Sequence, residues 1–224
     1  KKNIKHHIDV CNEFMLGYNF ATFEPMSADS FISKHWAADD DQNIQEDERV
    51  YFTKDNATRI DRAMKYINTF VKVKYRKFLL APLLVESSIH NNTNGQFSAF
   101  FKDETKSKGM FGGKGSVDIK RITGQIKLPY PILINTGATP IISQMDTNEW
   151  INQIEQVDLI YYDPPYNKHP YNIYYFLLDI INDWNMDISI PNTYRGQPKN
   201  WIKSPWCSFS KAKDMFDKLI KQTK

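Results

Sequence analysis

The sequence predicts an α/β protein, in which helices pack on an open, mainly parallel sheet that carries a largely helical, basic insertion. Three observations support this fold class. Apolar runs at 131–134, 140–145 and 157–162, rich in β-branched and aromatic residues, are typical of strands. A helical signal between the second and third runs makes a strand, helix, strand unit, whose connection should be right-handed. Amphipathic patterns elsewhere supply helices to cover the sheet.

Composition places the chain among soluble globular proteins. Its 224 residues, 41% of them hydrophobic, can bury a sizeable core. No apolar run approaches the length of a membrane span, and no charged leader with an apolar centre opens the sequence, so we expect a cytoplasmic protein. Cys11 and Cys207 lie far apart and are expected to be free thiols. The adjacent His6 and His7 lack other ligand residues, and no metal site is predicted.

The net charge of +3 hides a local separation of charge. Residues 102–127 carry seven Lys or Arg against three Asp or Glu, and residues 195–224 carry eight against two. Residues 39–48 hold six acidic residues and no basic one, which favours a solvated loop. Any single charged run is usually a solvent-exposed face, but two basic stretches also suit an anionic partner.

The first 24 residues contain short apolar groups without a clear period. Asp9 follows Ile8 and could end a strand, where an acid can bind a ribose hydroxyl. The alternative is a surface aspartate near a chain end.

Two helices are expected after the acidic run. Asp55 or Asn56 can cap the first, whose apolar residues follow the helical period. These residues are Ile60, Ala63, Met64, Ile67 and Phe70. Residues 78–89 are almost continuously apolar around Pro82, which indicates a kinked buried helix or a helix that starts near the proline.

The last third of the chain holds the strongest local signals. Asp146 can cap a helix with Glu149 at its third position. The run at 157–162 ends at Asp163-Pro164-Pro165-Tyr166, where two prolines remove donors and fix the backbone. Ligands bind at the carboxyl ends of strands in open α/β sheets, so Asp146 and Asp163 should share one edge. Helical patterns follow at 173–184 and from about Ser210.

The Asp163 to Tyr166 motif resembles the signature of amino-methyltransferases that use S-adenosylmethionine. Its continuation at 167–178 is similar to the Dam-related class of DNA adenine-N6 methyltransferases. Further similar stretches are 51–61, 79–101, 192–196 and 201–205. The resemblance covers most of the chain from about Val50, and only the four-residue motif is strongly specific. It implies a Rossmann-like methyltransferase sheet, S-adenosylmethionine as cofactor, double-stranded DNA as substrate and a cognate restriction endonuclease as partner.

The resemblance also assigns roles to residues. Asp163 would accept one hydrogen of the adenine amino group, the carbonyl of Pro164 in the Pro164-Pro165 turn would accept the other, and Tyr166 would stack on the flipped-out base. Asp146 would contact the adenosyl part of the cofactor, together with Asp163. Asp9 is expected to contact the cofactor on its strand-end pattern alone, because the resemblance does not reach it. The residues expected to wall the base pocket are Asn167, Tyr171 and Tyr175. The alternatives are an ordinary Pro-Pro turn and tyrosines packed in the core.

The basic stretches take on a meaning in this context. Residues 106–116 are rich in Lys, Gly and Ser, but they lack the preceding strand and following helix of a phosphate-binding loop. They are interpreted either as a basic loop that lies on a DNA backbone or as a plain surface loop. The expected DNA contacts are Lys114, Lys120, Arg121, Arg195, Lys199 and Lys203. Three parts are predicted: residues 1–49 as partial catalytic domain, 50–127 as inserted target-recognition region and 128–224 as catalytic core.

The sequence departs from the family in one respect. The family's Phe-x-Gly-x-Gly loop, which holds the methionine half of the cofactor, has no match before Val50, and the chain stops at Lys224 where the family continues. We therefore expect part of the cofactor site to lie in a further segment. The four-residue motif alone also allows methylation of cytosine N4 or of a guanine in ribosomal RNA, and a non-catalytic DNA-binding subunit is the remaining alternative.

Overall fold

The computed structural model describes residues 2–17, 30–134, 136–165, 169–199 and 204–223. The chain divides into two compact units. Unit 1 comprises Lys1–Ile132 and Tyr175–Lys199, and unit 2 comprises Leu133–Tyr174 and Asn200–Lys224. The three parts expected from the sequence were defined by their functions and not by their packing, so that division stays a prediction.

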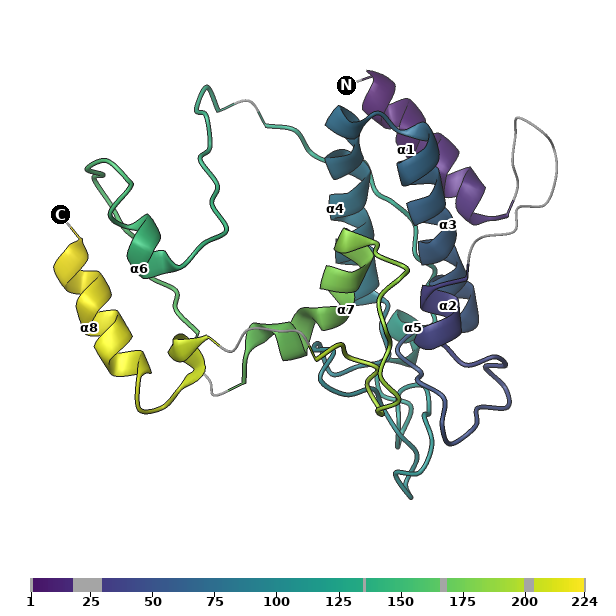
Figure 1. The fold of residues 1–224 in the computed structure, drawn as a ribbon. Helices are drawn as coiled ribbons and strands as arrows, with labels where there is room; N and C mark the ends of the chain where they lie inside the picture. The colour runs from purple at the N-terminus through teal and green to yellow at the C-terminus, as the bar shows by residue number, and fades with distance from the viewer. Residues whose placement is uncertain (1, 18–29, 135, 166–168, 200–203, 224) are drawn as a thin grey trace. The chain divides into compact units, whose positions relative to one another are not determined.

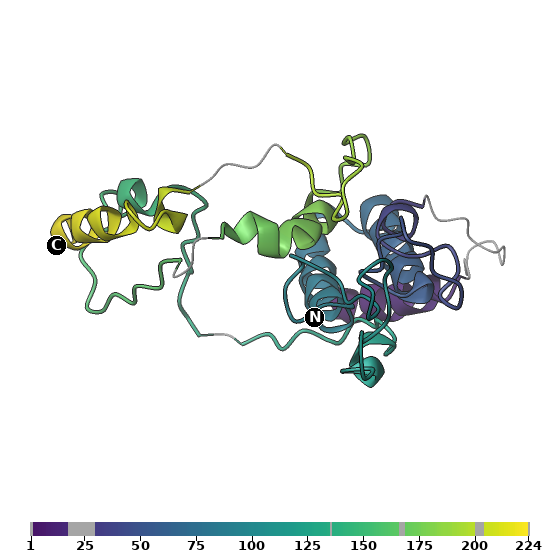
Figure 2. The ribbon, with the colours of Figure 1, turned by 90° about the horizontal axis from the view of Figure 1, so that it is seen from below.

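Three helices that lie side by side form the frame of unit 1 (Figures 1 and 2): α1 (Lys2–Met15), α3 (Lys54–Phe70) and α4 (Val73–Ile89). The helix expected after Asp55 or Asn56 is confirmed as α3, although its cap is Thr53, whose hydroxyl accepts a hydrogen bond from the Asn56 amide at 3.2 Å. Of its expected core residues, Phe70 alone is largely exposed, at 51%, because it ends the helix. Helix α4 continues through Pro82, so the interpretation of a start near that proline is wrong.

Shorter helices complete unit 1. Helix α2 (Ile32–His35) begins over the buried Asp61, whose carboxylate accepts backbone N–H bonds from Phe31, Ile32 and Ser33 at 2.8–3.3 Å. Helix α5 (Ile119–Ile122) is one turn long. The helix predicted after the Asp163 motif is confirmed as α7 (Tyr171–Asp183), which belongs to unit 1 from Tyr175 onward. Its buried apolar residues, Phe176, Leu177, Ile180 and Ile181, join the same core.

Buried amides fix the long connection between α4 and α5. Asn92 donates to the carbonyls of Val50, at 2.9 Å, and Met110, at 3.3 Å, and it accepts from the Gly112 amide at 3.0 Å. Gly112 has a φ of 70°, and a Cβ there would lie 2.6 Å from a backbone oxygen, so only glycine suits this turn. The hydrogen bonds of Asn92 therefore fix the backbone from which the basic loop extends.

The predicted Rossmann-like sheet is wrong. The regular secondary structure of the described residues is helical, and their only strand-like pairs are isolated bridges, Ala37 with Phe52, Thr93 with Phe100 and Lys102 with Gly109. The apolar runs at 131–134, 140–145 and 157–162 lie outside the helices and pair with no strand in the described part of the chain. Asp9, expected at a strand end, lies inside α1.

A physical reason explains this difference. β-Branched residues favour a pleated surface only where a neighbouring strand and its side chains cover them. The crossover between parallel strands also needs a dozen or more residues, usually a helix, and the helix between the second and third runs has four residues. The local pattern was present in the sequence, but the pairing that makes a strand is absent from the described structure.

Unit 2 is built from α6 (Thr147–Trp150), the 3-10 helix η1 (Pro205–Cys207) and α8 (Ala212–Gln222). The predicted final helix is confirmed as α8. A small core holds the unit together through Ile151, Trp206 and Leu219, with Met215 and Phe216 packed against it. None of the helices in the described residues is long and apolar enough to cross a membrane.

Candidate functional site

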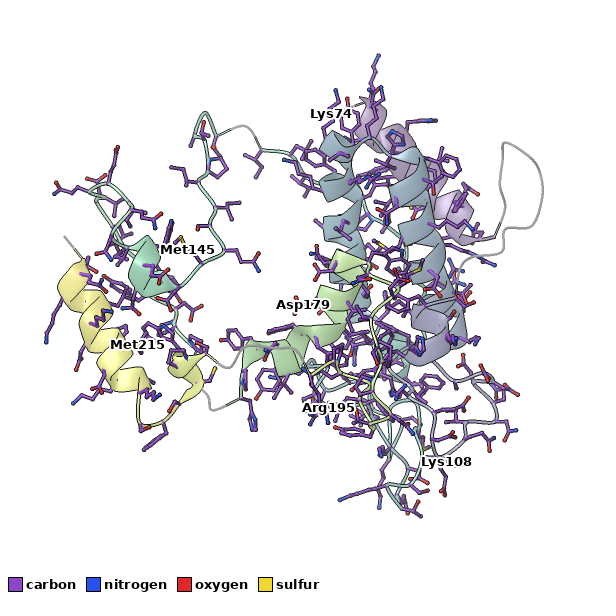
Figure 3. The ribbon with its side chains drawn as sticks, viewed as in Figure 1. Lys74, Lys108, Met145, Asp179, Arg195 and Met215 are labelled. Carbon is purple, nitrogen blue, oxygen red and sulfur yellow. The ribbon has the colours of Figure 1, made fainter. Side chains whose placement is uncertain are left out.

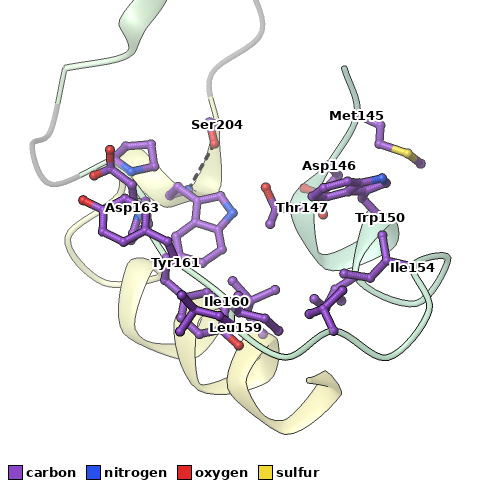
Figure 4. Close-up of a pocket in the computed structure, with 17 residues that line it drawn as sticks. Met145, Asp146, Thr147, Trp150, Ile154, Leu159, Ile160, Tyr161, Asp163 and Ser204 are labelled. Atoms are coloured by element: carbon purple, nitrogen blue, oxygen red, sulfur yellow. Dashed lines mark hydrogen bonds between the residues drawn. The ribbon is translucent and has the colours of Figure 1, made fainter. Parts of the chain in front are cut away.

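A cavity of about 490 Å³ lies within unit 2 (Figure 4). Two segments that are distant in sequence meet there: Asp146 lines it at the start of α6, and Asp163, Pro164 and Pro165 line it from the motif. The sequence predicted that the two carboxylates would share an edge. They do line one cavity, although the described residues form no sheet that could bring them there.

Helix capping places the first carboxylate. Asp146 has an extended backbone, and its side chain accepts a hydrogen bond from the Asn148 amide at 2.9 Å, which confirms the predicted cap. The buried Asn148 side chain donates to the Met215 carbonyl at 3.2 Å and to Gln222 at 3.1 Å, so α6 is attached to α8. Trp150, at the end of α6, extends the cavity wall beyond Asp146 (Figure 4).

Anchoring of the preceding residue places the second carboxylate. The ring of Tyr162 contacts that of Phe216 edge-on, with centroids 5.9 Å apart, and its hydroxyl forms a hydrogen bond with Thr223. Its neighbour Tyr161 is 85% exposed, so alternate residues face the small core as in any extended segment. Asp163 follows directly. Its carboxylate is exposed and has no hydrogen-bond partner among the described residues, so it is available to a ligand.

The η1 segment contributes the cavity residues that the sequence did not single out. Ser204 accepts a hydrogen bond from the Trp206 amide at 3.3 Å, and Pro205 occupies the first helical position. Trp206 is buried against Phe216, with ring centroids 6.4 Å apart. A serine before a proline is a helix-start signal that could have placed the turn. Nothing in the sequence could have placed it beside Asp163.

These features define what the cavity can bind. Two carboxylates can accept hydrogen bonds from hydroxyl or amino groups. Trp150 and Trp206 present flat aromatic surface, and apolar residues such as Ile154 and Ile160 cover much of the rest. The cavity therefore suits a ligand that combines a flat ring with hydroxyl or amino groups.

Other predicted site residues lie elsewhere or outside the described residues. Asp9 belongs to unit 1 and does not line the cavity; its carboxylate accepts a hydrogen bond from Tyr130. Tyr171 and Tyr175 lie in the first turns of α7 and are 39% and 42% exposed. Three candidates, Tyr166, Asn167 and Lys203, fall outside the residues that the structure describes. Their roles stay predictions.

The predicted DNA contacts differ in their surroundings. Lys114 forms an ion pair with Glu104 at 3.3 Å, and Lys120 and Lys199 are exposed. Arg121 donates hydrogen bonds to the carbonyls of Ile89, Asn91 and Thr93, just beyond the end of α4. Arg195 contacts Tyr194 and the carbonyl of Ser98. Each remains a predicted contact.

Comparison with known proteins gives three related sequences. The chain is 28% identical over 176 residues to the Type II methyltransferase M.CviAII of Paramecium bursaria Chlorella virus 1, an alignment that covers 77% of this chain and 48% of that protein. It is 29% identical over 180 residues to the Type II methyltransferase M.NlaIII of Neisseria lactamica, covering 78% and 48%. The Type II methyltransferase M.FokI of Planomicrobium okeanokoites is 27% identical over 183 residues, covering 78% and 25%.

The chain thus spans about half the length of two of these relatives and a quarter of the third. No protein-family model and no solved structure matches it. The similarity is modest in identity but extends over more than three quarters of the chain, which is far more than the four-residue motif alone.

Proposed function

We propose that this chain is part of a DNA methyltransferase of the restriction–modification type, which transfers a methyl group from S-adenosylmethionine to N6 of an adenine. The observation that carries the proposal is the shared cavity of Asp146 and the Asp163-Pro164-Pro165 segment. The similarity to three Type II methyltransferases supports the reaction class. The motif, in its extended form up to residue 178, supports adenine over other bases.

The cavity residues fit the adenosyl part of this cofactor. Asp146 uses one carboxylate oxygen for the cap of α6, and the other is available to the hydroxyls of a ribose. Trp150 offers its indole face to an adenine ring. When bound, S-adenosylmethionine would supply an electrophilic methyl group to the amino nitrogen of the substrate, and the broken sulfur–methyl bond would leave S-adenosylhomocysteine.

Asp163 and Pro164 would prepare the substrate nitrogen. The carboxylate of Asp163 accepts one hydrogen of the amino group, and the Pro164 carbonyl accepts the other. Both bonds draw the nitrogen lone pair out of conjugation with the ring and fix its direction, and the rigid proline fixes where its carbonyl points. The N–H becomes acidic only as the new N–C bond forms, so the Asp163 carboxylate takes the proton late and passes it to water.

The DNA substrate imposes a further requirement. The amino group of a paired adenine lies inside the duplex, so the base must leave the stack, at a cost of a few kcal/mol. Tyr166 is the residue that the motif offers as a stacking surface. Positioning of the two substrates would supply most of the rate, since no covalent enzyme intermediate is needed.

A methyl-transfer assay tests the proposal. The complete protein encoded by the gene is incubated with methyl-labelled S-adenosylmethionine and, separately, with duplex DNA and with ribosomal RNA. Nuclease digestion and chromatography then identify the modified base. We expect N6-methyladenine in DNA. Label in N4-methylcytosine or in RNA guanine would refute the adenine assignment, and DNA binding without any transfer would indicate a non-catalytic subunit.

A further inference from the structure

Two loops of unit 1 that are distant in sequence meet at one carbonyl group. The hydroxyl of Tyr194 and the Nε of Arg195 both donate to the Ser98 carbonyl, each at 2.6 Å. The ring of Tyr194 also lies 5.9 Å from that of Phe100. The loop after α7 is therefore joined to the segment that precedes the basic loop, and Tyr194 is held at their junction while 44% exposed.

Side chains from elsewhere in unit 1 hold this junction in place by hydrogen bonds to its backbone. Arg49 donates to the carbonyls of Thr193 and Pro191, both at 3.0 Å. Trp36, which is fully buried, donates from its indole nitrogen to the Arg195 carbonyl at 3.0 Å. Three backbone carbonyls within five residues are thus held by side-chain donors. The loop is a preformed surface whose geometry is set before any partner arrives.

Two cations flank the exposed ring. The Nζ of Lys102 lies 5.2 Å from the centroid of the Tyr194 ring and 5.6 Å from that of Phe100, and the guanidinium carbon of Arg195 lies 5.1 Å from the Tyr194 centroid. Both distances to Tyr194 are typical of cation–π contacts. Neither cation forms an ion pair with a carboxylate in the described part of the chain. The two cations therefore share one aromatic ring and have no ion-pair partner among the described residues.

The acidic residues that follow Lys102 in the sequence have their own hydrogen-bond or ion-pair partners. The Asp103 carboxylate is used within its own loop, where it accepts from the Ser107 amide at 3.0 Å and the Thr105 hydroxyl at 2.8 Å. Glu104 pairs with Lys114. Arg195 uses its Nε for Ser98, and its two terminal nitrogens have no hydrogen-bond partner among the described residues. Those nitrogens form the donor pair that suits two oxygens of one phosphate.

We infer that Lys102 and Arg195, braced on Tyr194, form a binding site for a backbone phosphate of double-stranded DNA. This inference rests on the proposed function and deepens it, because it distinguishes this phosphate contact from two other basic residues that were predicted to contact DNA. Lys114 is already paired, and Arg121 is bound to carbonyl groups. The terminal nitrogens of Arg195 bind two phosphate oxygens, Lys102 binds from the side, and the rigid loops reduce the ordering cost on binding.

A charge-matched pair of variants tests this site. Lys102→Gln removes one cation with little effect on the fold, since its only hydrogen bond in the described structure is long, 3.4 Å to the Lys106 carbonyl. The control is Lys74→Gln, because Lys74 also lies over a tyrosine ring, at 5.0 Å from the centroid of Tyr75. Lys74 lies at the opposite end of the unit 1 helices from Arg195 (Figure 3). Arg195→Gln is the second test variant, and circular dichroism checks its fold.

The measurement is the affinity for a fluorescent DNA duplex of about 30 base pairs, titrated from low to high salt with the complete protein. Losing one phosphate contact should lower the slope of log K against log salt by about 0.9 and weaken binding about tenfold at low salt. We expect this for Lys102→Gln and for Arg195→Gln, with Lys74→Gln unchanged.

The outcomes separate the site from the proposed reaction. Equal slopes for Lys102→Gln and Lys74→Gln, in a protein that still methylates DNA, overturn the phosphate site and leave the methyltransferase intact. A lowered slope in a protein that methylates nothing supports the site and refutes the reaction. Tighter binding to RNA of the same sequence, or no DNA binding at all, overturns the assignment to duplex DNA.

Discussion

Replacing Arg121 by methionine tests whether this residue stabilises the fold, rather than contacting a partner. The guanidinium donates from Nη1 to the carbonyls of Ile89 and Asn91, the latter at 2.9 Å, and from Nη2 to that of Thr93 at 3.0 Å. Carbonyls at a helix end lack partners within the helix and need others. Methionine keeps most of the aliphatic length but leaves all three carbonyls without this donor.

The magnitude follows from these contacts. A hydrogen bond from a charged donor contributes about 1.5–3 kcal/mol net, so three such bonds would give at least about 4.5 kcal/mol in a fully buried setting. The Arg121 side chain is 29% exposed, which lets water replace part of the loss. The ion pair with Asp118, at 3.6 Å, is exposed and adds little. We expect Arg121→Met to lower the free energy of unfolding of unit 1 by about 3 kcal/mol.

The assay must read unit 1 alone, because two units need not unfold together. Hydrogen exchange of peptides from α3 and α4, followed through a urea titration, does so. With a urea slope of about 2 kcal/mol per M, the midpoint should fall by about 1.5 M. Arg121→Lys is the matched control, since it keeps the charge but not the forked donors, and should lose about half as much. A midpoint within 0.2 M of wild type, taken as about the precision of the method, would refute a structural role.

Three further predictions follow from single residues. Asp163→Asn should lower the rate of methyl transfer by about 10²–10⁴-fold. DNA affinity and the unfolding midpoint should not change, because the carboxylate is exposed and unpaired in the described structure. A variant that keeps a tenth of the wild-type rate would exclude the catalytic role of Asp163. Burial raises the pKa of Asp61 above its ordinary value, so between pH 7 and about 4 the folded chain binds more protons than the unfolded chain. The wild-type protein should therefore gain stability relative to Asp61→Asn as the pH falls through that range. A difference in the free energy of unfolding that does not change with pH would contradict this. Burial raises the pKa of Cys11 to about 12. In a Cys207→Ser variant, a thiol reagent at about pH 8 should therefore label Cys11 only after urea is added. Rapid labelling of the native protein would show that α1 opens.

Local signals in the sequence predicted the helices well. The helix at 54–70, the cap at Asp146 and the amphipathic α7 each depend on residues within a few positions of one another. Asp146 and Asp163 line one cavity, but they were expected together at the edge of a sheet, and the described residues form no such sheet. The helix signals hold without a sheet.

Long-range partners could not be predicted. The sequence assigned Arg121 by its charge and its basic neighbours, but its carbonyl partners lie about thirty residues earlier in the chain. Trp206 was not singled out because its place beside the Asp163 segment depends on packing against Phe216. The prediction of a sheet was wrong for the same reason. An apolar pattern shows what one segment prefers, whereas strand pairing requires a second segment beside it.

The apolar runs outside the helices of unit 2 affect how the protein behaves at high concentration. Ile141, Ile142 and Leu159 are 83–89% exposed, on segments whose backbone amides and carbonyls pair with no strand in the described residues. Short β-prone stretches of this kind, with few charges and an open backbone, are templates for association between molecules. Preparations of this chain alone should therefore aggregate with increasing concentration. A single lysine at Ile142 should delay that aggregation without changing the cavity, which Ile142 does not line.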